Sequence, residues 1–222
     1  MAGQTDPQSA APRTPLSKER VLRAAIQLAD AEGIEALSMR RLAKELGVEA
    51  MSLYNHVANK GEILAGIIDL VAGEFDLPSD ESEWKVAMRR NAISSRDVLL
   101  AHRWATSIWM SQGGGPARLR NGDWMLRTLR EAGFSPELIY HAFHILESYV
   151  LGYTLQQLNF PYKGEELAGL AADFLKQIPV EDYPDLVEHI HQHIEPHDEE
   201  TSGFELGLDL ILDGLDRARA NA

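Results

Sequence analysis

The most informative segment for the fold runs from Ser38 to His56: Ser38-Met-Arg-Arg-Leu-Ala-Lys-Glu-Leu-Gly-Val-Glu-Ala-Met-Ser-Leu-Tyr-Asn-His56. Ser38 is a preferred N-cap residue, and Leu42 and Leu46 lie four positions apart on one face of the helix that it begins. Gly47 follows the last apolar residue and can adopt the left-handed conformation that ends a helix. A second helix is expected to start soon after it. This spacing predicts a helix-turn-helix, a motif whose second helix can lie in the major groove of DNA.

The second helix of this motif is expected to expose side chains suited to DNA. Ser, Tyr and His can hydrogen-bond phosphate oxygens, and Arg and Lys can pair with them. Ala50 and Met51 would meet base edges with apolar groups, which favours contact with a thymine methyl. An ordinary helix–glycine–helix corner without DNA contacts is the alternative interpretation. The candidate DNA-binding residues are Arg40, Glu49, Ala50, Met51, Ser52, Tyr54, Asn55, His56 and Lys60.

The amino-acid composition excludes several classes of protein. The chain has 222 residues, no cysteine and a formal net charge of −13, and 45% of its residues are hydrophobic, as in globular proteins. Without cysteine there is no disulfide framework, thiolate nucleophile or cysteine-based zinc site, which favours a cytoplasmic protein. We expect no signal peptide and no membrane span, because the longest apolar stretch, 63–73, is short and contains Asp69.

The acidity is uneven along the chain. Residues 76–222 hold 24 acidic and 13 basic side chains, whereas residues 1–75 hold 10 and 8. A nearly neutral first segment can approach an anion such as DNA, and the acidic remainder disfavours indiscriminate coating of nucleic acid.

Helical periodicity continues along almost the whole chain, so the sequence predicts an all-α protein. Breaks rich in Gly, Pro and polar residues separate the expected helices at 76–82, 113–116, 133–136, 159–164, 178–184 and 195–203. The predicted organisation is a disordered arm (1–15), a three-helix helix-turn-helix domain (16–62) and a larger helical domain (63–222).

Residues 17–75 resemble the N-terminal domain of the TetR family of transcriptional regulators. The resemblance rests on Leu37-Ser-Met-Arg40, Leu46-Gly-Val48 and the run Leu53-Tyr-x-His-Val-x-x-Lys60, and it continues loosely through Trp84 and 90–100 to the last helix. It implies that Arg40, Ser52, Tyr54, His56 and Lys60 touch DNA phosphates or nearby groups. It also implies that Ala50 and Met51 read bases, where tetracycline repressors carry other residues, so the operator sequence stays open. Family habit favours repression over activation.

The C-terminal part is implied by the resemblance to be a dimerisation and effector-binding domain. Residues 136–158 are apolar almost all round, so this helix must be buried on more than one side. The final helix carries an apolar stripe beside small residues that allow close approach of another helix. A homodimer through a four-helix interface is therefore expected. The candidate interface residues are Tyr149, Tyr153, Gly207, Ile211 and Gly214.

The same domain could hold a pocket, since pockets tend to be apolar with a few polar groups. The candidate lining residues are Trp104, Ile108, Trp109, Trp124, Phe143, His144 and Glu147, with ordinary core packing as the alternative for each. Tetracycline repressors hold a magnesium–drug chelate partly through histidines. Trp109 stands at one of those positions and Phe75 or Asp76 near the other. An indole cannot ligate magnesium. We therefore expect a small aromatic or amphipathic effector rather than tetracycline, and no metal or other cofactor.

A histidine-rich segment, 189–200, supports a rival from another class. His189 and His193 are four positions apart and could share a zinc ion with His197 or Asp198, in a metal-dependent hydrolase or a metal-binding protein. No HExxH motif, Gly-rich phosphate loop or nucleophile motif accompanies them. A solvated acidic segment is the simpler interpretation, so the chain is predicted not to be an enzyme.

Overall fold

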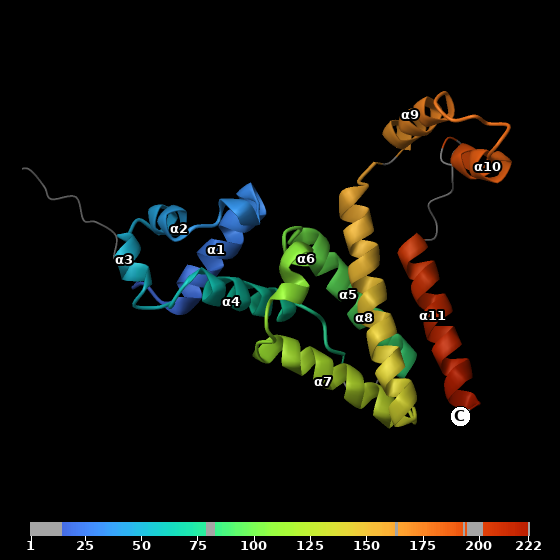
Figure 1. Cartoon of the computed structure of the whole chain (residues 1–222). Helices are drawn as coiled ribbons and strands as arrows, with labels where there is room; N and C mark the ends of the chain where they lie inside the picture. Colours follow the sequence, from blue (N-terminus) through green and yellow to red (C-terminus); the bar gives the residue numbers. More distant parts are fainter. Residues whose placement is uncertain (1–14, 79–82, 163, 193, 195–201, 222) are drawn as a thin grey trace, which may run out of the picture. The chain divides into compact units, whose positions relative to one another are not determined.

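The computed structural model describes residues 15–78, 83–162, 164–192, 194 and 202–221. Every regular element within these ranges is helical, which confirms the all-α prediction (Figure 1). Within the same ranges, no helix combines the length and apolar character that a bilayer span requires. The elements are α1 (Lys18–Glu32), η1 (Ile34–Ala36), α2 (Met39–Leu46), α3 (Ala50–Leu53), α4 (Lys60–Ala72), α5 (Trp84–Ala101), α6 (Ala105–Ile108), η2 (Trp109–Ser111), α7 (Pro116–Glu131), α8 (Pro136–Asn159), α9 (Gly164–Leu175), α10 (Pro184–Gln192) and α11 (Gly203–Ala220).

Contacts divide the chain into two units, Met1–Ile68 and Asp69–Ala222. The division falls inside α4, later than the boundary at 62/63 expected from the sequence. One continuous helix therefore begins in the first unit and ends in the second.

Local signals set the helix ends in the first unit. The Ser38 hydroxyl accepts a hydrogen bond from the backbone N–H of Arg41 at 3.2 Å, which caps α2. Gly47 has φ 66° and ψ 36°, the left-handed conformation expected of it, and the chain then turns into α3. Leu42 and Leu53, one from each helix of the motif, have no exposed surface. The helix-turn-helix predicted from the sequence is thus present.

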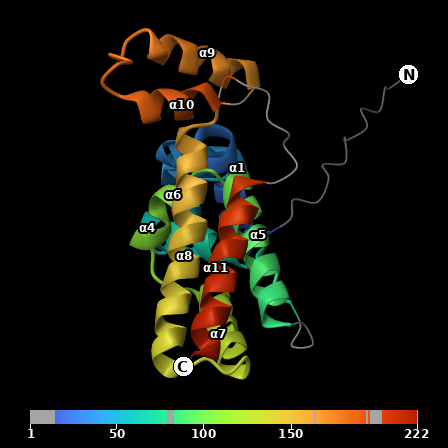
Figure 2. The same cartoon turned by 90° about the vertical axis from the view of Figure 1, so that its right-hand side faces the viewer.

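In the second unit, α8 packs against α5, α7 and α11. Both views show α8 and α11 side by side along their lengths, with α9 and α10 beyond the end of α8 (Figures 1 and 2). Pro116 begins α7 and Pro136 begins α8, where their missing N–H groups cost no helical hydrogen bond. The core beneath α11 includes the fully buried side chains of Phe204 and Leu208.

Two helices end before the next break that the sequence predicts. Helix α4 ends at Ala72, ahead of the break at 76–82, with Phe75 buried beyond it. Helix α5 stops at Ala101, although the next predicted break is at 113–116. A turn follows, and then α6 and η2, so that both Trp104 and Trp109 are buried. Burial of these two indoles outweighs continuation of the helix, a tertiary effect that periodicity cannot reveal.

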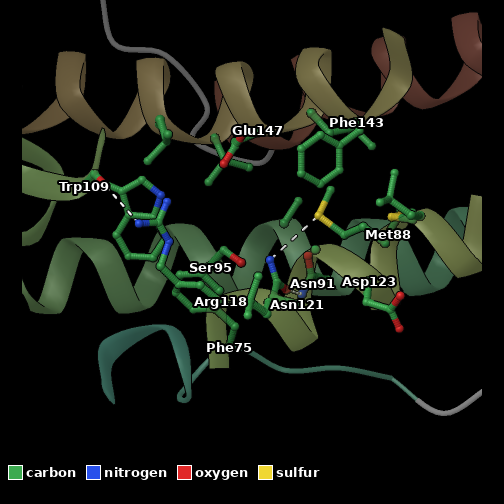
Figure 3. Close-up of a pocket in the computed structure, with 18 of the residues that line it drawn as sticks. Phe75, Met88, Asn91, Ser95, Trp109, Arg118, Asn121, Asp123, Phe143 and Glu147 are labelled. Atoms are coloured by element: carbon green, nitrogen blue, oxygen red, sulfur yellow. Dashed lines mark hydrogen bonds between the residues drawn. The ribbon is translucent and has the colours of Figure 1, made fainter. Parts of the chain in front are cut away.

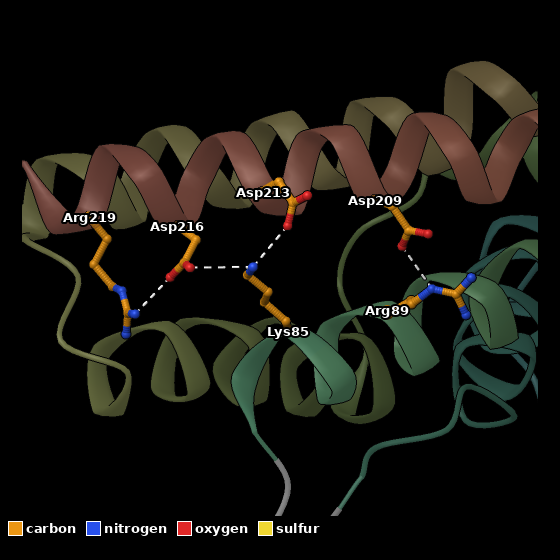
Figure 4. Close-up of polar contacts among 6 residues, drawn as sticks. All are labelled: Lys85, Arg89, Asp209, Asp213, Asp216 and Arg219. Atoms are coloured by element: carbon orange, nitrogen blue, oxygen red, sulfur yellow. Dashed lines mark hydrogen bonds and ion pairs between the residues drawn. The ribbon is translucent and has the colours of Figure 1, made fainter.

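Ion pairs connect α5 to α11 (Figure 4). Lys85 Nζ lies 2.8 Å from Asp213 Oδ1 and 3.3 Å from Asp216 Oδ2, and Arg89 Nε lies 2.8 Å from Asp209 Oδ1. The hydrogen bond from Lys85, followed by its positive charge, holds the pKa of Asp213 below its ordinary value of 3.8. A carboxyl group with a lowered pKa in the folded state stabilises the fold above that ordinary value, and this contribution is lost as the pH falls through the lowered pKa.

A Lys85→Met variant should therefore lose less stability than the parent on acidification. We expect the urea midpoint to fall by a smaller amount between about pH 6 and about pH 3, because Asp213 titrates nearer its ordinary value in the variant. The effect should be small, since the pair is exposed. Arg130→Met is the matched control: it removes a cation with no ion pair in the described part of the chain. An equal pH dependence in Lys85→Met and Arg130→Met would contradict the prediction.

Candidate DNA-binding surface and effector cavity

The candidate DNA-binding residues lie around α3, which is shorter than expected. The helix ends at Leu53, so Tyr54, Asn55 and His56 do not lie on it as the sequence suggested. They form a turn instead, in which the N–H groups of His56 and Val57 both donate to the Leu53 carbonyl oxygen, at 2.9 and 3.0 Å. Buried Leu53 and Val57 anchor this turn at both sides. The turn therefore has a fixed shape although the helix has ended.

The side chains expected to meet DNA are accessible. Met51 is 74% exposed and Tyr54 is 47% exposed, large values for an apolar and an aromatic side chain. Ala50, Ser52 and His56 are half-buried. The other candidates, Arg40, Glu49, Asn55 and Lys60, are exposed. All nine predicted residues thus lie on or beside the helix-turn-helix with some accessible surface.

The cations of this unit differ in availability. Arg41 is held by ion pairs with Glu32 and Glu45, and its pKa is raised above the ordinary value, chiefly by the hydrogen bond to Glu32. Arg40 and Lys60 make no ion pair within the described residues. Within these residues no carboxylate competes with a phosphate for Arg40 or Lys60, whereas two glutamates hold Arg41.

The start of α4 is fixed by a reciprocal cap. The Asn59 side chain accepts a hydrogen bond from the Glu62 N–H at 2.9 Å, and the Glu62 carboxylate accepts one from the Ala58 N–H at 2.6 Å. The Ala58 bond and the neighbouring Lys18 lower the pKa of Glu62. Such caps hold the first turn of a helix in register. The cap sets the backbone position of Lys60, which lies between its two partners in the sequence.

The second unit contains a cavity of about 440 Å³, a size that suits a drug-like molecule. It lies between α8 on one side and α5 and α7 on the other, and Figure 3 shows Phe143 and Glu147 reaching down from α8. Apolar rings and thioethers form most of the wall, and a few polar groups interrupt it. The main lining residues are Phe75, Met88, Asn91, Ser95, Leu99, Trp109, Arg118, Asn121, Asp123, Met125, Phe143, Glu147 and Val150.

Three of the seven candidate pocket residues line this cavity: Trp109, Phe143 and Glu147. The other four lie elsewhere. Trp124 is buried and donates its indole N–H to the Pro78 carbonyl oxygen at 3.0 Å, Trp104 is buried, Ile108 is half-buried and His144 is exposed. These four residues were expected to line a pocket, but they do not line this cavity. The sequence could not separate the two cases, because core positions and cavity walls show the same apolar spacing along a helix.

Several polar residues that line the cavity were not predicted from the sequence. Asn91 and Ser95 are buried and lie four residues apart on α5 between apolar neighbours. Asn91 Nδ2 donates to the Asp76 carbonyl oxygen at 2.8 Å and to Asn121 Oδ1 at 3.0 Å. Polar residues at helical spacing within an apolar stripe were the available signal for this wall.

An aromatic and cationic stack closes one end of the cavity. Phe75 and Trp109 are stacked with ring centroids 5.6 Å apart, and the Arg118 guanidinium lies 4.7 Å from the centroid of the Trp109 ring. Arg118 Nη1 also donates to the carbonyl oxygens of Trp109 and Gln112, at 3.1 and 2.9 Å. Trp109 and Phe75 stand at or near the positions where tetracycline repressors were expected to carry magnesium-binding histidines. At these positions the cavity presents aromatic rings.

A carboxylate from α4 fixes the start of α7. Asp69 Oδ1 accepts hydrogen bonds from the backbone N–H groups of Ala117 and Arg118, at 2.9 and 3.1 Å. This cap satisfies helix donors that otherwise lack partners. Gly115 makes room for it: a Cβ atom at this position would lie 2.3 Å from Asp69 Cγ. The cap sets the position of Arg118, and thereby the wall beside Trp109.

The candidate dimer residues divide into two groups. The first group joins α8 to α11 within one chain and comprises Tyr149, Tyr153 and Gly207. The Tyr149 hydroxyl donates a hydrogen bond to the Phe204 carbonyl oxygen at 2.9 Å. A Cβ atom at Gly207 would lie 2.1 Å from the same Tyr149 hydroxyl oxygen. Both Tyr rings also contact the Phe204 ring. Burial raises the pKa of Tyr149. Ile211 is half-buried, and Gly214 faces open space except for the tip of Arg217.

The histidine-rich segment lies mostly outside the described residues, including His193, His197 and Asp198. Among the residues that are described, no three His, Asp or Glu side chains are placed to share a metal ion. The metal-dependent alternative thus has no structural support.

Comparisons with known proteins agree with both units. The family "Bacterial regulatory proteins, tetR family" matches residues 21–67, and "Tetracyclin repressor-like, C-terminal domain" matches residues 77–219. The HTH-type transcriptional repressor DrrR1 of Streptomyces coeruleorubidus is 34% identical over 94% of this chain and 80% of its own length. The class A tetracycline repressor of Escherichia coli transposon 1721 is 30% identical over 93% of each chain.

A solved structure shows the same architecture with a ligand. The TetR family protein ActR of Streptomyces coelicolor, in complex with actinorhodin, is 31% identical and superposes with a TM-score of 0.78 over 93% of this chain and 99% of its own. The matches cover the helix-turn-helix and the helical body that holds the cavity. On these grounds the chain belongs to the TetR family of bacterial transcriptional regulators.

Proposed function

We propose that this protein is a ligand-responsive transcriptional repressor that binds a pseudo-palindromic operator. The observation that carries the proposal is the exposure of Met51 and Tyr54 at the helix-turn-helix, beside Arg40 and Lys60, which make no ion pair with the residues that the structure describes. Arg40, Ser52, Tyr54, His56 and Lys60 anchor phosphates, and Ala50 and Met51 contact bases in the major groove. Glu49 and Asn55 border the same contact.

Fluorescence anisotropy against the DNA upstream of the gene tests this function. Labelled upstream DNA should be bound in preference to a scrambled duplex, and the affinity should fall as salt is raised, because phosphate contacts release counterions. Equal affinity for upstream and scrambled DNA at every salt concentration would contradict specific operator binding.

The cavity supports an aromatic or amphipathic effector. Its walls combine the stacked Phe75–Trp109 pair with Phe143 and the thioethers of Met88 and Met125. Such walls favour planar apolar molecules over a hydrated metal chelate. Release of DNA follows if the effector binds better to a conformation in which the two recognition helices have the wrong spacing. The continuous helix α4 links the two units along the chain.

A homodimer is expected because neighbouring helices leave large apolar side chains exposed. On α8, Tyr140 and Ile145 are 63% and 44% exposed, and on α11, Leu206 and Leu210 are 54% and 62% exposed. Gly214 adds a place where another helix can approach closely. Association through α8 and α11 of two chains would cover these groups and place one recognition helix over each operator half-site.

Leu210→Glu should weaken this dimer by at least tenfold, because it places a charge in a desolvated contact. Size-exclusion chromatography with light scattering at micromolar concentration should give the dimer mass for the parent and a smaller mass for the variant. Val86→Glu, which charges a 55% exposed residue on α5, is the control and should stay dimeric. A monomeric parent would refute the dimer.

We assign the protein no catalytic activity and no cofactor, and we place its action in the cytoplasm with the operator. The assignment is supported by the matched relatives, which are named as transcriptional repressors.

A further inference from the structure

Glu147 is a polar group of the cavity lining that makes no polar interaction with the described part of the protein. It lies on α8 one turn after Phe143, and both side chains point into the cavity (Figure 3). The residue is half-buried, and its carboxylate has no hydrogen bond or ion pair with any residue that the structure describes. A carboxylate withdrawn from water without a partner is unfavourable, so a ligand that supplies one gains affinity.

The one guanidinium in the described lining is already engaged. Arg118 Nη1 donates to two backbone carbonyl oxygens, and the group lies over the Trp109 ring. It makes no ion pair with Glu147. Asp123, exposed at the edge of the cavity, adds a second carboxylate. The lining therefore holds two unpaired negative charges against one positive charge that the fold has already used.

The amide donors of the cavity are likewise used within the protein. Asn91 Nδ2 bonds to the Asp76 carbonyl oxygen and to Asn121, and Asn121 Nδ2 is directed at the Met125 sulfur at 3.8 Å. The Glu147 carboxylate, in contrast, has oxygen atoms that are free to accept hydrogen bonds. A complementary ligand must bring the donor, and a cationic donor satisfies the charge as well.

We propose that the effector is an aromatic cation whose protonated nitrogen binds Glu147. Its ring system packs against Phe143 and the Phe75–Trp109 pair, and the Met88 and Met125 thioethers fill the remaining apolar wall. This inference rests on the proposed function, which supplies the role of the cavity, and it adds the charge class of the ligand.

Three probes of one shape and different charge test the proposal: 9-aminoacridine, a cation at neutral pH, acridine, which is neutral, and acridine-9-carboxylate, an anion. Their affinities for the full-length protein are measured by fluorescence titration without DNA. 9-Aminoacridine should bind at least tenfold more tightly than either of the others. In Glu147→Gln its affinity should fall about tenfold, while acridine binds within twofold of its affinity for the parent.

Acridine binding in Glu147→Gln shows that the cavity is intact, so a folding defect cannot imitate the expected result. Glu137→Gln, which neutralises an exposed carboxylate on the same helix away from the cavity, should leave all three affinities unchanged. A preference for the anion, unchanged 9-aminoacridine binding in Glu147→Gln, or no binding of any probe would overturn the proposal. Upstream-DNA binding measured without probes separates that failure from failure of the repressor function.

Discussion

Gly115→Ala should destabilise the C-terminal unit by about 2–4 kcal/mol, from overpacking and from loss of a helix cap. The new Cβ would lie 2.3 Å from Asp69 Cγ and 2.4 Å from Asp69 Oδ1, so the carboxylate that caps α7 must move. We expect the melting temperature to fall by roughly 5–15 °C in a protein of this size. Circular dichroism melting of the purified variant measures the shift.

Two further variants isolate the cause. Gly113→Ala adds a methyl group two residues earlier, where nothing lies within 4 Å, and should change stability by less than about 0.5 kcal/mol. Asp69→Ala removes the two nearest atoms, so Gly115→Ala should cost less in that background than in the parent. The Cβ of residue 69, 2.7 Å from the added methyl group, remains in this background, so only part of the loss should be relieved. Fully additive losses in the double variant would show that the clash with the Asp69 carboxylate is not responsible.

Tyr54→Ala/Lys60→Ala should reduce operator affinity by about 100-fold for each half-site that the dimer contacts. Each side chain is exposed, and each is assigned a phosphate contact worth roughly 1–1.5 kcal/mol. Loss of the lysine contact should also lower the slope of log affinity against log salt by about 0.9 for each half-site. Anisotropy titrations between about 50 and 200 mM salt measure both quantities.

Lys176→Ala is the matched control, because it removes an exposed cation directly after α9, in the other unit. It should bind operator as the parent does. The thermal stability of the double variant should also match the parent, since neither substituted side chain belongs to the core. Parental affinity in Tyr54→Ala/Lys60→Ala would move the phosphate contacts away from this surface.

The sequence predicted those features of the fold whose signals are local. Ser38 and Gly47 bound α2 as expected, and Pro116 and Pro136 begin α7 and α8, because caps and prolines act within one helical turn. The end of α5 at Ala101 was missed. It depends on burying Trp104 and Trp109 against other helices, and such non-local packing leaves no mark on periodicity.

The residues of the candidate DNA-binding surface and of the cavity were also predicted only in part. The residues proposed to face DNA follow from a motif whose spacing predicts which positions are exposed, although α3 is short and Tyr54 lies just beyond it. In the cavity, aromatic bulk identified Trp109 and Phe143 but also Trp124, which packs against Pro78 instead. Which side of a helix borders empty space depends on its neighbours, so the polar wall around Asn91 was found only in the structure.

The Asp69 cap should lower the affinity of any ligand that has to break it in order to bind. Breaking it costs about 1–2 kcal/mol, the usual worth of a helix N-cap. A ligand whose bound position displaces the first turn of α7 therefore binds roughly 5- to 30-fold more weakly than one of equal contacts that leaves the turn in place. Asp69 lies on α4, the helix that begins at Lys60. The affinity of a ligand should therefore depend on whether it disturbs α4 as well as on its fit to the cavity walls.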